Sequence, residues 1–148
     1  MFRLSKAADY SIRGILHLAM KPNGGPTDVG EIAKAQGVST AYLAKLFQTL
    51  AKKGHIRSIR GFEGGFVLVK RPSEINLYEI IEAVEGPIFL NDCLIHSGFC
   101  VRDELCPVHD VWKDAQQRFL EHLKGTTFES LAKASKVKRA RAAKRRQT

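Results

Sequence analysis

The segment "GVSTAYLAKLFQTLAKKGHIRSIRGFEGGFVL", residues 37–68, decides the fold of this chain. Ser39 is placed to cap a helix, because a serine hydroxyl accepts a hydrogen bond from a backbone N–H of the first helical turn. We expect that helix to end near Lys53, where Gly54 follows as a terminator. Its apolar side chains recur at helical spacing and predict one buried stripe, namely Leu43, Leu46, Phe47 and Leu50.

Two extended runs follow this helix and predict a β-hairpin. Ile56–Ile59 and Phe66–Val69 carry branched and aromatic apolar residues, and the connection "RGFEGG" between them contains three glycines. A shorter helix begins before the segment, at Thr27 or Asp28. It ends before Gly37, which makes the turn because glycine tolerates a positive φ. Two short helices, a tight turn and a hairpin are the outline of a winged helix-turn-helix.

The rest of the chain predicts further helices around this unit. Residues 5–20 form a capped amphipathic helix, residues 77–84 a short one and residues 107–124 a longer one. From residue 132 onward the chain is basic and poor in large apolar groups, so we expect it to be disordered in the free protein. The predicted fold class is mostly α with a small β-hairpin wing, a winged helix-turn-helix plus a long C-terminal helix.

The composition is that of an ordinary globular protein, with 148 residues, of which 44% are apolar and 26% charged. The formal net charge is +9, and eight basic residues without an acid lie in residues 132–148, which leaves a net +1 for residues 1–131. No apolar stretch approaches the ~20 residues of a membrane span, and the N-terminus lacks the apolar core of a signal peptide. We therefore expect a cytoplasmic protein without a membrane partner. The sequence has no nucleophile–base pair, phosphate-binding glycine loop or dinucleotide fingerprint, which argues against an enzyme.

All three cysteines lie within one stretch, with the spacing Cys93-x6-Cys100-x5-Cys106-x2-His109. In a reducing compartment an odd number of cysteines disfavours a disulfide framework. Cysteine thiolates hold iron–sulfur clusters, and histidine can replace a thiolate as a ligand. Structural zinc and a metal-free thiol–disulfide switch are the alternatives, although zinc sites usually use cysteines two to four residues apart.

Three parts of the sequence resemble the bacterial iron–sulfur-cluster transcription regulators of the IscR and NsrR type. They are "MFRLSKAADYSIRGILHLA" at residues 1–19, the segment at residues 37–68 and the three-cysteine loop, and the likeness extends to about Leu123. The resemblance implies a homodimeric winged-helix regulator of double-stranded DNA, in which the long helix is a dimerisation helix that packs against its partner's. Two recognition helices then face one palindromic operator, about one DNA turn apart. Ala44 departs from the pattern, because some members carry there a glutamate that discriminates among operators.

The fourth ligand beside Cys93, Cys100 and Cys106 has two candidates. His109 lies three residues after Cys106 at a helix start, so both side chains can face the same side. By the resemblance, Asp9 falls where the nitric-oxide-sensing branch uses an aspartate of the partner protomer. The implied cofactor is an iron–sulfur cluster, [2Fe–2S] or [4Fe–4S], that gates DNA binding in response to redox poise, nitric oxide or iron–sulfur status. The alternative function is a winged-helix regulator that is metal-independent or works through zinc or a thiol switch.

The predicted DNA contacts combine outward-facing polar positions with positions that the resemblance indicates. They are Ser39, Thr40, Ala41, Tyr42, Lys45, Gln48, Lys52, Arg57 and Arg60. Without DNA binding, these residues would form a solvated helix face and an ordinary hairpin. We divide the chain into a winged helix-turn-helix DNA-binding domain at 1–86, a cysteine-rich cluster-binding loop at 87–107, a dimerisation helix region at 108–131 and a basic disordered tail at 132–148.

Overall fold

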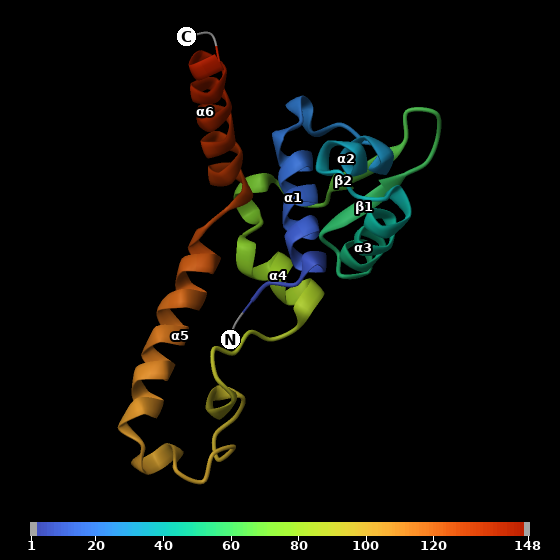
Figure 1. The fold of residues 1–148 in the computed structure, drawn as a ribbon. Coiled ribbons are helices and arrows are strands. Elements are labelled where there is room, and N and C mark those ends of the chain that lie inside the picture. Colours follow the sequence, from blue (N-terminus) through green and yellow to red (C-terminus); the bar gives the residue numbers. More distant parts are fainter. Residues whose placement is uncertain (1–2, 147–148) are drawn as a thin grey trace.

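A computed structural model describes residues 3–146 of the chain. The α-helices and strands in chain order are α1 (Lys6–Met20), α2 (Val29–Gln36), α3 (Thr40–Lys52), β1 (Ile56–Ile59), β2 (Gly65–Leu68), α4 (Leu77–Glu85), α5 (Pro107–Gly125) and α6 (Phe128–Arg146). Short 3-10 turns lie at Pro22–Gly24, Pro72–Glu74, Asp92–Leu94 and Asp103–Leu105. Figure 1 shows α1 at the centre of a body formed with α2, α3, α4 and the hairpin, from which α5 and α6 extend in opposite directions. The mostly helical winged-helix class is confirmed.

The helix-turn-helix follows the capping signals of the sequence. The Asp28 carboxylate accepts hydrogen bonds from the backbone of the first turn of α2, and the Ser39 hydroxyl accepts one from Tyr42 N at the start of α3. Between them, Gly37 has φ 65°, in the left-handed region that favours glycine. Local hydrogen bonding therefore sets both helix starts and the turn that joins them.

The hairpin pairs Ile56 with Leu68 and Ile59 with Gly65 in an antiparallel register. The second strand begins and ends one residue earlier than the expected Phe66–Val69. Its bounds follow from the register with β1, in which Gly65 pairs with Ile59; Phe66 also exchanges backbone hydrogen bonds with Thr27, just before α2. At Gly65 a side chain would overlap the Thr27 carbonyl, so only glycine lets the wing approach the helix-turn-helix this closely.

One main core joins elements from both ends of the chain. Ile15, Phe47 and Ile80 are fully buried in it, and so is Phe128 at the start of α6. The winged helix-turn-helix is therefore completed by a residue far beyond position 86. A second, smaller cluster of Ile81, Ile88 and Leu123 holds the C-terminal end of α5 against α4.

The prediction of a disordered basic tail at residues 132–148 is wrong for residues 132–146. These residues continue α6, and Ala132 is itself buried. Alanine, lysine and arginine are strong helix formers, and the buried Phe128 supplies the starting turn that an isolated tail lacks. The division at residue 131 thus falls inside a helix, while Gln147 and Thr148 lie outside the described residues.

Candidate functional site

The outward face of α3 carries the residues expected to meet DNA. Thr40, Ala41, Tyr42, Lys45, Gln48 and Lys52 are all exposed, whereas the alternate stripe of Leu43, Phe47 and Leu50 is buried. Ser39 is exposed as well, but its hydroxyl oxygen already accepts the Tyr42 N–H at 3.2 Å. The apolar stripe holds the helix on the body, and the polar face is left free for a ligand.

Tyr42 is held in place by a neighbour on α1. Its ring meets the Tyr10 ring edge to face, with 6.1 Å between centroids and an angle of 87°. The Arg13 guanidinium lies 5.9 Å from the centroid of the Tyr10 ring, and Arg13 is also ion-paired with Asp9 at 2.8 Å. The side chain of Tyr42 is therefore positioned by α1 while 37% of the residue remains exposed.

The wing carries Arg57 and Arg60 on its exposed surface, as the sequence predicts. Sequence reasoning overlooked Phe62, which is fully exposed at the hairpin tip. The available signal was its place between the glycines of the turn, where no partner strand can cover an aromatic side chain. An arginine next to an exposed phenyl ring at a loop tip suits the edge of a duplex groove.

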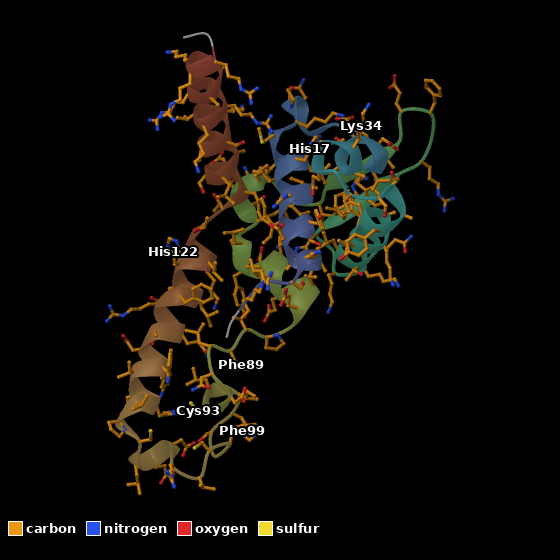
Figure 2. The ribbon with its side chains drawn as sticks, in the orientation of Figure 1. His17, Lys34, Phe89, Cys93, Phe99 and His122 are labelled. Carbon is orange, nitrogen blue, oxygen red and sulfur yellow. The ribbon has the colours of Figure 1, made fainter. Side chains whose placement is uncertain are left out.

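The cysteine loop connects α4 to α5 and lies beside the N-terminal half of α5 (Figure 2). Cys93, Cys100 and Cys106 are free and half-buried. Cys106 is the N-cap of α5, and Pro107 occupies the first helical position, where its missing N–H costs nothing. Gly98 has φ 79° and donates its backbone N–H to the Asp103 carboxylate at 2.7 Å, which closes the middle of the loop.

The loop brings Cys93 and His109 together on one cavity. This cavity has a volume of about 470 Å³ and is also lined by His96, Asp103 and Glu104, whereas Cys100 and Cys106 do not line it. Across residues 3–146, no three histidine, cysteine or acidic side chains converge closely enough to hold a metal ion. The loop conformation of the single protomer therefore collects one thiol and two imidazoles, and not the three thiols that the spacing predicts.

The two candidates for the fourth ligand differ in what their side chains already contact. His109 Nδ1 is buried without a hydrogen-bond partner within the described residues. The Asp9 carboxylate is on the exposed side of α1 and is paired with Arg13. A buried, unpartnered ring nitrogen is costly unless something else binds it. Of the two candidates, only Asp9 is already paired within the described residues.

The donor set fits an iron–sulfur cluster in its chemistry. Three thiols and one imidazole are the ligand types that such clusters use, and none of the three cysteines is committed to a disulfide. Cluster ligation by all three cysteines requires the loop to close further around the cavity.

The N-terminal half of α5 exposes a row of apolar side chains. Val108 is 55% exposed, Val111 65% and Trp112 40%, while the C-terminal half is held by the buried Leu123. A run of exposed apolar groups on one helix is typical of a protein–protein contact surface. This surface is where the dimerisation helix was predicted.

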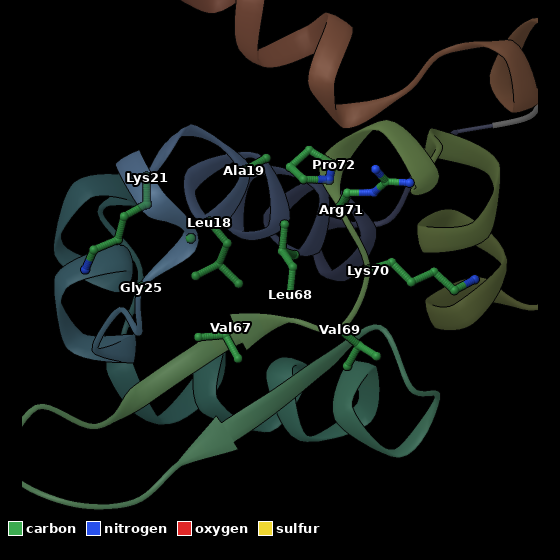
Figure 3. Close-up of a pocket in the computed structure, with 11 residues that line it drawn as sticks. Leu18, Ala19, Lys21, Gly25, Val67, Leu68, Val69, Lys70, Arg71 and Pro72 are labelled. Atoms are coloured by element: carbon green, nitrogen blue, oxygen red, sulfur yellow. The ribbon is translucent and has the colours of Figure 1, made fainter.

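Another hollow in the described part of the chain lies between α1 and β2 (Figure 3). It measures about 420 Å³ and has a floor of Leu18, Val67 and Leu68. Its rim carries Lys70 and Arg71, and the Arg71 guanidinium is paired with Glu74 at 3.1 Å. The lining contains no histidine, acid, serine or cysteine that could be paired with Lys21 or Lys70 as a nucleophile and its base.

Comparisons with known proteins agree with this geometry. The Rrf2 family model, described as an iron-dependent transcriptional regulator, matches residues 4–134. The chain is 33% identical over 135 residues to the HTH-type transcriptional regulator IscR of Photorhabdus laumondii, covering 91% of this chain and 82% of that protein. Among solved structures, CymR, the global cysteine regulator of B. subtilis, superposes with a TM-score of 0.69 at 32% identity, covering 90% of this chain and 98% of CymR. IscR of T. potens superposes with a TM-score of 0.73 at 26% identity, covering 90% and 88%. Among residues 3–146, no helix is both long and apolar enough for a membrane span.

Proposed function

The chain belongs to the Rrf2 family of transcriptional regulators, and on that premise we propose that it is a homodimeric, sequence-specific regulator whose DNA binding is gated by an iron–sulfur cluster. Its relatives are named as transcription regulators, a class that is not enzymatic. The proposed site of action is the cytoplasm. The proposed target is a palindromic duplex that two copies of α3 read about one turn apart.

The observation that carries this proposal is the presence of three free thiols in one loop, followed in the first turn of α5 by His109, whose Nδ1 is buried without a partner among the described residues. Cys93, Cys100, Cys106 and His109 are the proposed ligands. When bound, an iron–sulfur cluster supplies a redox-active centre whose ligation would hold this loop in one conformation. Helix α5 connects this loop to the DNA-binding body, because Cys106 is the N-cap of α5 and the C-terminal end of α5 packs on α4. Closing or releasing the loop would therefore change how the two bodies of a dimer are spaced, an order–disorder type of switch.

The test is purification without oxygen, followed by absorption spectroscopy, iron and sulfide analysis, and selection of a binding site from a random duplex library. We expect a coloured protein that selects a palindrome, with an affinity that changes when the cluster is removed. A colourless protein without sulfide, whose selected site is bound equally with and without iron, contradicts cluster gating.

Single substitutions separate the two candidates for the fourth ligand. His109→Ala is expected to lower cluster content or stability, whereas His96→Ala, in the same cavity, is the matched control and is expected to leave the spectrum unchanged. Asp9→Asn tests the other assignment, because it removes the charge and keeps the size. If Asp9→Asn bleaches the spectrum and His109→Ala does not, the ligand comes from the partner protomer.

A second candidate function is a winged-helix regulator with a thiol or zinc switch in place of a cluster. The observation that favours it is that the three thiols are free and not converged on one metal position in the part of the chain that the structure describes. CymR of Staphylococcus aureus, 26% identical to this chain, has been solved in an oxidised form. Zinc analysis and thiol titration of the anaerobic protein distinguish this function, since it predicts no sulfide and either bound zinc or DNA binding that responds to disulfide formation.

A further inference from the structure

The helix α6 is tied to the DNA-binding body at its first turn. Phe128 is fully buried in the main core, and its N–H donates to the Ile75 carbonyl at 2.9 Å. Next to it, Leu77 N donates to the Thr126 carbonyl at 3.0 Å. The direction of α6 is therefore set by the same core that positions the recognition helix, and Figure 1 shows the helix projecting past the end of α1.

Beyond its first turns, α6 is mostly exposed to solvent. All residues from 136 to 146 are exposed, and Val137, at 51% exposed, is the one large apolar side chain among them. The helix has no apolar face in this part that could pack on a protein core. Its helicity rests on the intrinsic preference of alanine, lysine and arginine.

The exposed part of α6 is strongly and uniformly basic. Its cations are Lys133, Lys136, Lys138, Arg139, Arg141, Lys144, Arg145 and Arg146, against one acid, Glu129, which pairs with Lys133 at 3.2 Å. At 1.5 Å per residue the helix is roughly 28 Å long, so cations recur along it about every 3–4 Å. Several lie three or four positions apart, as Lys138 and Arg141 do, and repel each other in the free helix.

We propose that residues 133–146, here called the basic arm, bind the phosphates of duplex DNA flanking the operator. The arm would then extend the contact that α3 and the wing make with the DNA. This inference rests on the proposed DNA-binding function. A duplex carries one negative charge per ~1.7 Å, so its backbone neutralises the arm without requiring any particular sequence. The rest of the chain carries a net charge of only +1, so the arm holds most of the net positive charge that the chain offers to a polyanion.

The chemistry of the arm favours duplex DNA over other polyanions. A helix that lies on a membrane needs a broad apolar face, which the arm lacks. Single-stranded nucleic acid is bound by aromatic platforms on which bases stack, and no aromatic residue follows Phe128. A sequence-independent phosphate contact needs only the cations that the arm has.

The test compares two duplexes that contain the site selected by the wild-type protein from a random library. One ends two base pairs outside the site and the other extends about 20 base pairs beyond it on each side. Binding is measured by fluorescence anisotropy across a salt series. The variant K138Q/R139Q/R141Q/R145Q/R146Q removes five charges with a helix-forming side chain. Its matched control, A140Q/A142Q/A143Q, places glutamine on the same helix and leaves the charge unchanged.

We expect wild type and control to bind the long duplex at least about tenfold more tightly than the short one at low salt. The slope of log K against log salt is expected to be steeper on the long duplex by about 3 to 5, at ~0.9 for each phosphate contacted. The five-charge variant is expected to bind both duplexes alike, with the short-duplex affinity of wild type. Equal binding of the long duplex by variant and wild type overturns the arm proposal and leaves the proposed function standing. An equal loss on both duplexes also overturns it, because the arm would then act inside the operator. A wild-type protein that selects no site refutes the proposed function itself.

Discussion

Replacing Phe128 with alanine tests whether α6 belongs to the folded body. The side chain is fully buried in the main core, between the elements that form the helix-turn-helix and the start of α6. Burial of an aromatic side chain removes on the order of 200 Å² from water, which at ~25 cal/mol per Å² corresponds to about 5 kcal/mol. Alanine keeps part of that area and leaves a cavity, so we expect a loss of about 3–5 kcal/mol. A domain of this kind is stable by about 5–15 kcal/mol, so the loss is readily measured.

The assay is urea unfolding followed by far-ultraviolet circular dichroism at one fixed protein concentration, because dimer stability depends on concentration. Val137→Ala is the control, since that residue is on the same helix and 51% exposed. It is expected to change stability by less than about 0.5 kcal/mol. If Phe128→Ala also unfolds within about 0.5 kcal/mol of wild type, α6 does not dock on the core, and the fixed direction of the basic arm is refuted.

Three further predictions address the wing, the hairpin base and the reading surface. Gly65→Ala is expected to cost about 2 kcal/mol or more in urea unfolding, because a side chain there overlaps the Thr27 backbone. Gly25→Ala, at a position open to solvent, is expected to be close to neutral, and equal losses would contradict the tight wing contact. Burial lowers the pKa of His55 below its ordinary 6.5, so the unfolded chain takes up a proton more readily. Stability is therefore expected to fall as pH drops through the range just below 6.5, and His55→Gln should flatten that part of the pH profile relative to wild type. Arg60→Gln is expected to weaken binding to the selected duplex by about 1–3 kcal/mol in an anisotropy titration. Arg118→Gln on α5 is the control, and an equal loss of affinity in both variants would contradict a DNA contact by the wing.

The elements that could be predicted from the sequence are those specified by neighbouring residues. Ser39 and Asp28 cap helices through groups two or three positions away, and Gly37 makes a turn that needs a positive φ. The stripe of Leu43, Phe47 and Leu50 identifies the buried side of α3 and, by exclusion, the face that carries the predicted DNA contacts. Each of these signals lies within about one or two helical turns of its effect.

The features that could not be predicted depend on residues far apart in the chain. The close approach of β2 to the start of α2 comes from the pairing of Phe66 with Thr27, which lie far apart in the chain. The helical state of the basic segment follows from Phe128, whose partners in the main core, such as Ile15, Phe47 and Ile80, lie far away in the sequence. Composition alone indicated a disordered tail, because it counts the charges of a segment and not the anchor that precedes them.

The cysteine loop also has properties that follow from local sequence and properties that follow from tertiary contacts. The sequence by itself determined which donors are present, since three thiols and His109 are set by residue identity and spacing. Only the tertiary structure decided how they are arranged, because the loop has no regular hydrogen-bond ladder and its path is set by packing of α5 on α4. In the folded chain His109 Nδ1 is buried without a hydrogen-bond partner among the described residues, while Asp9 is paired with Arg13. Local chemistry therefore names the candidate ligands, and the tertiary contacts set which of them already has a partner within the protomer.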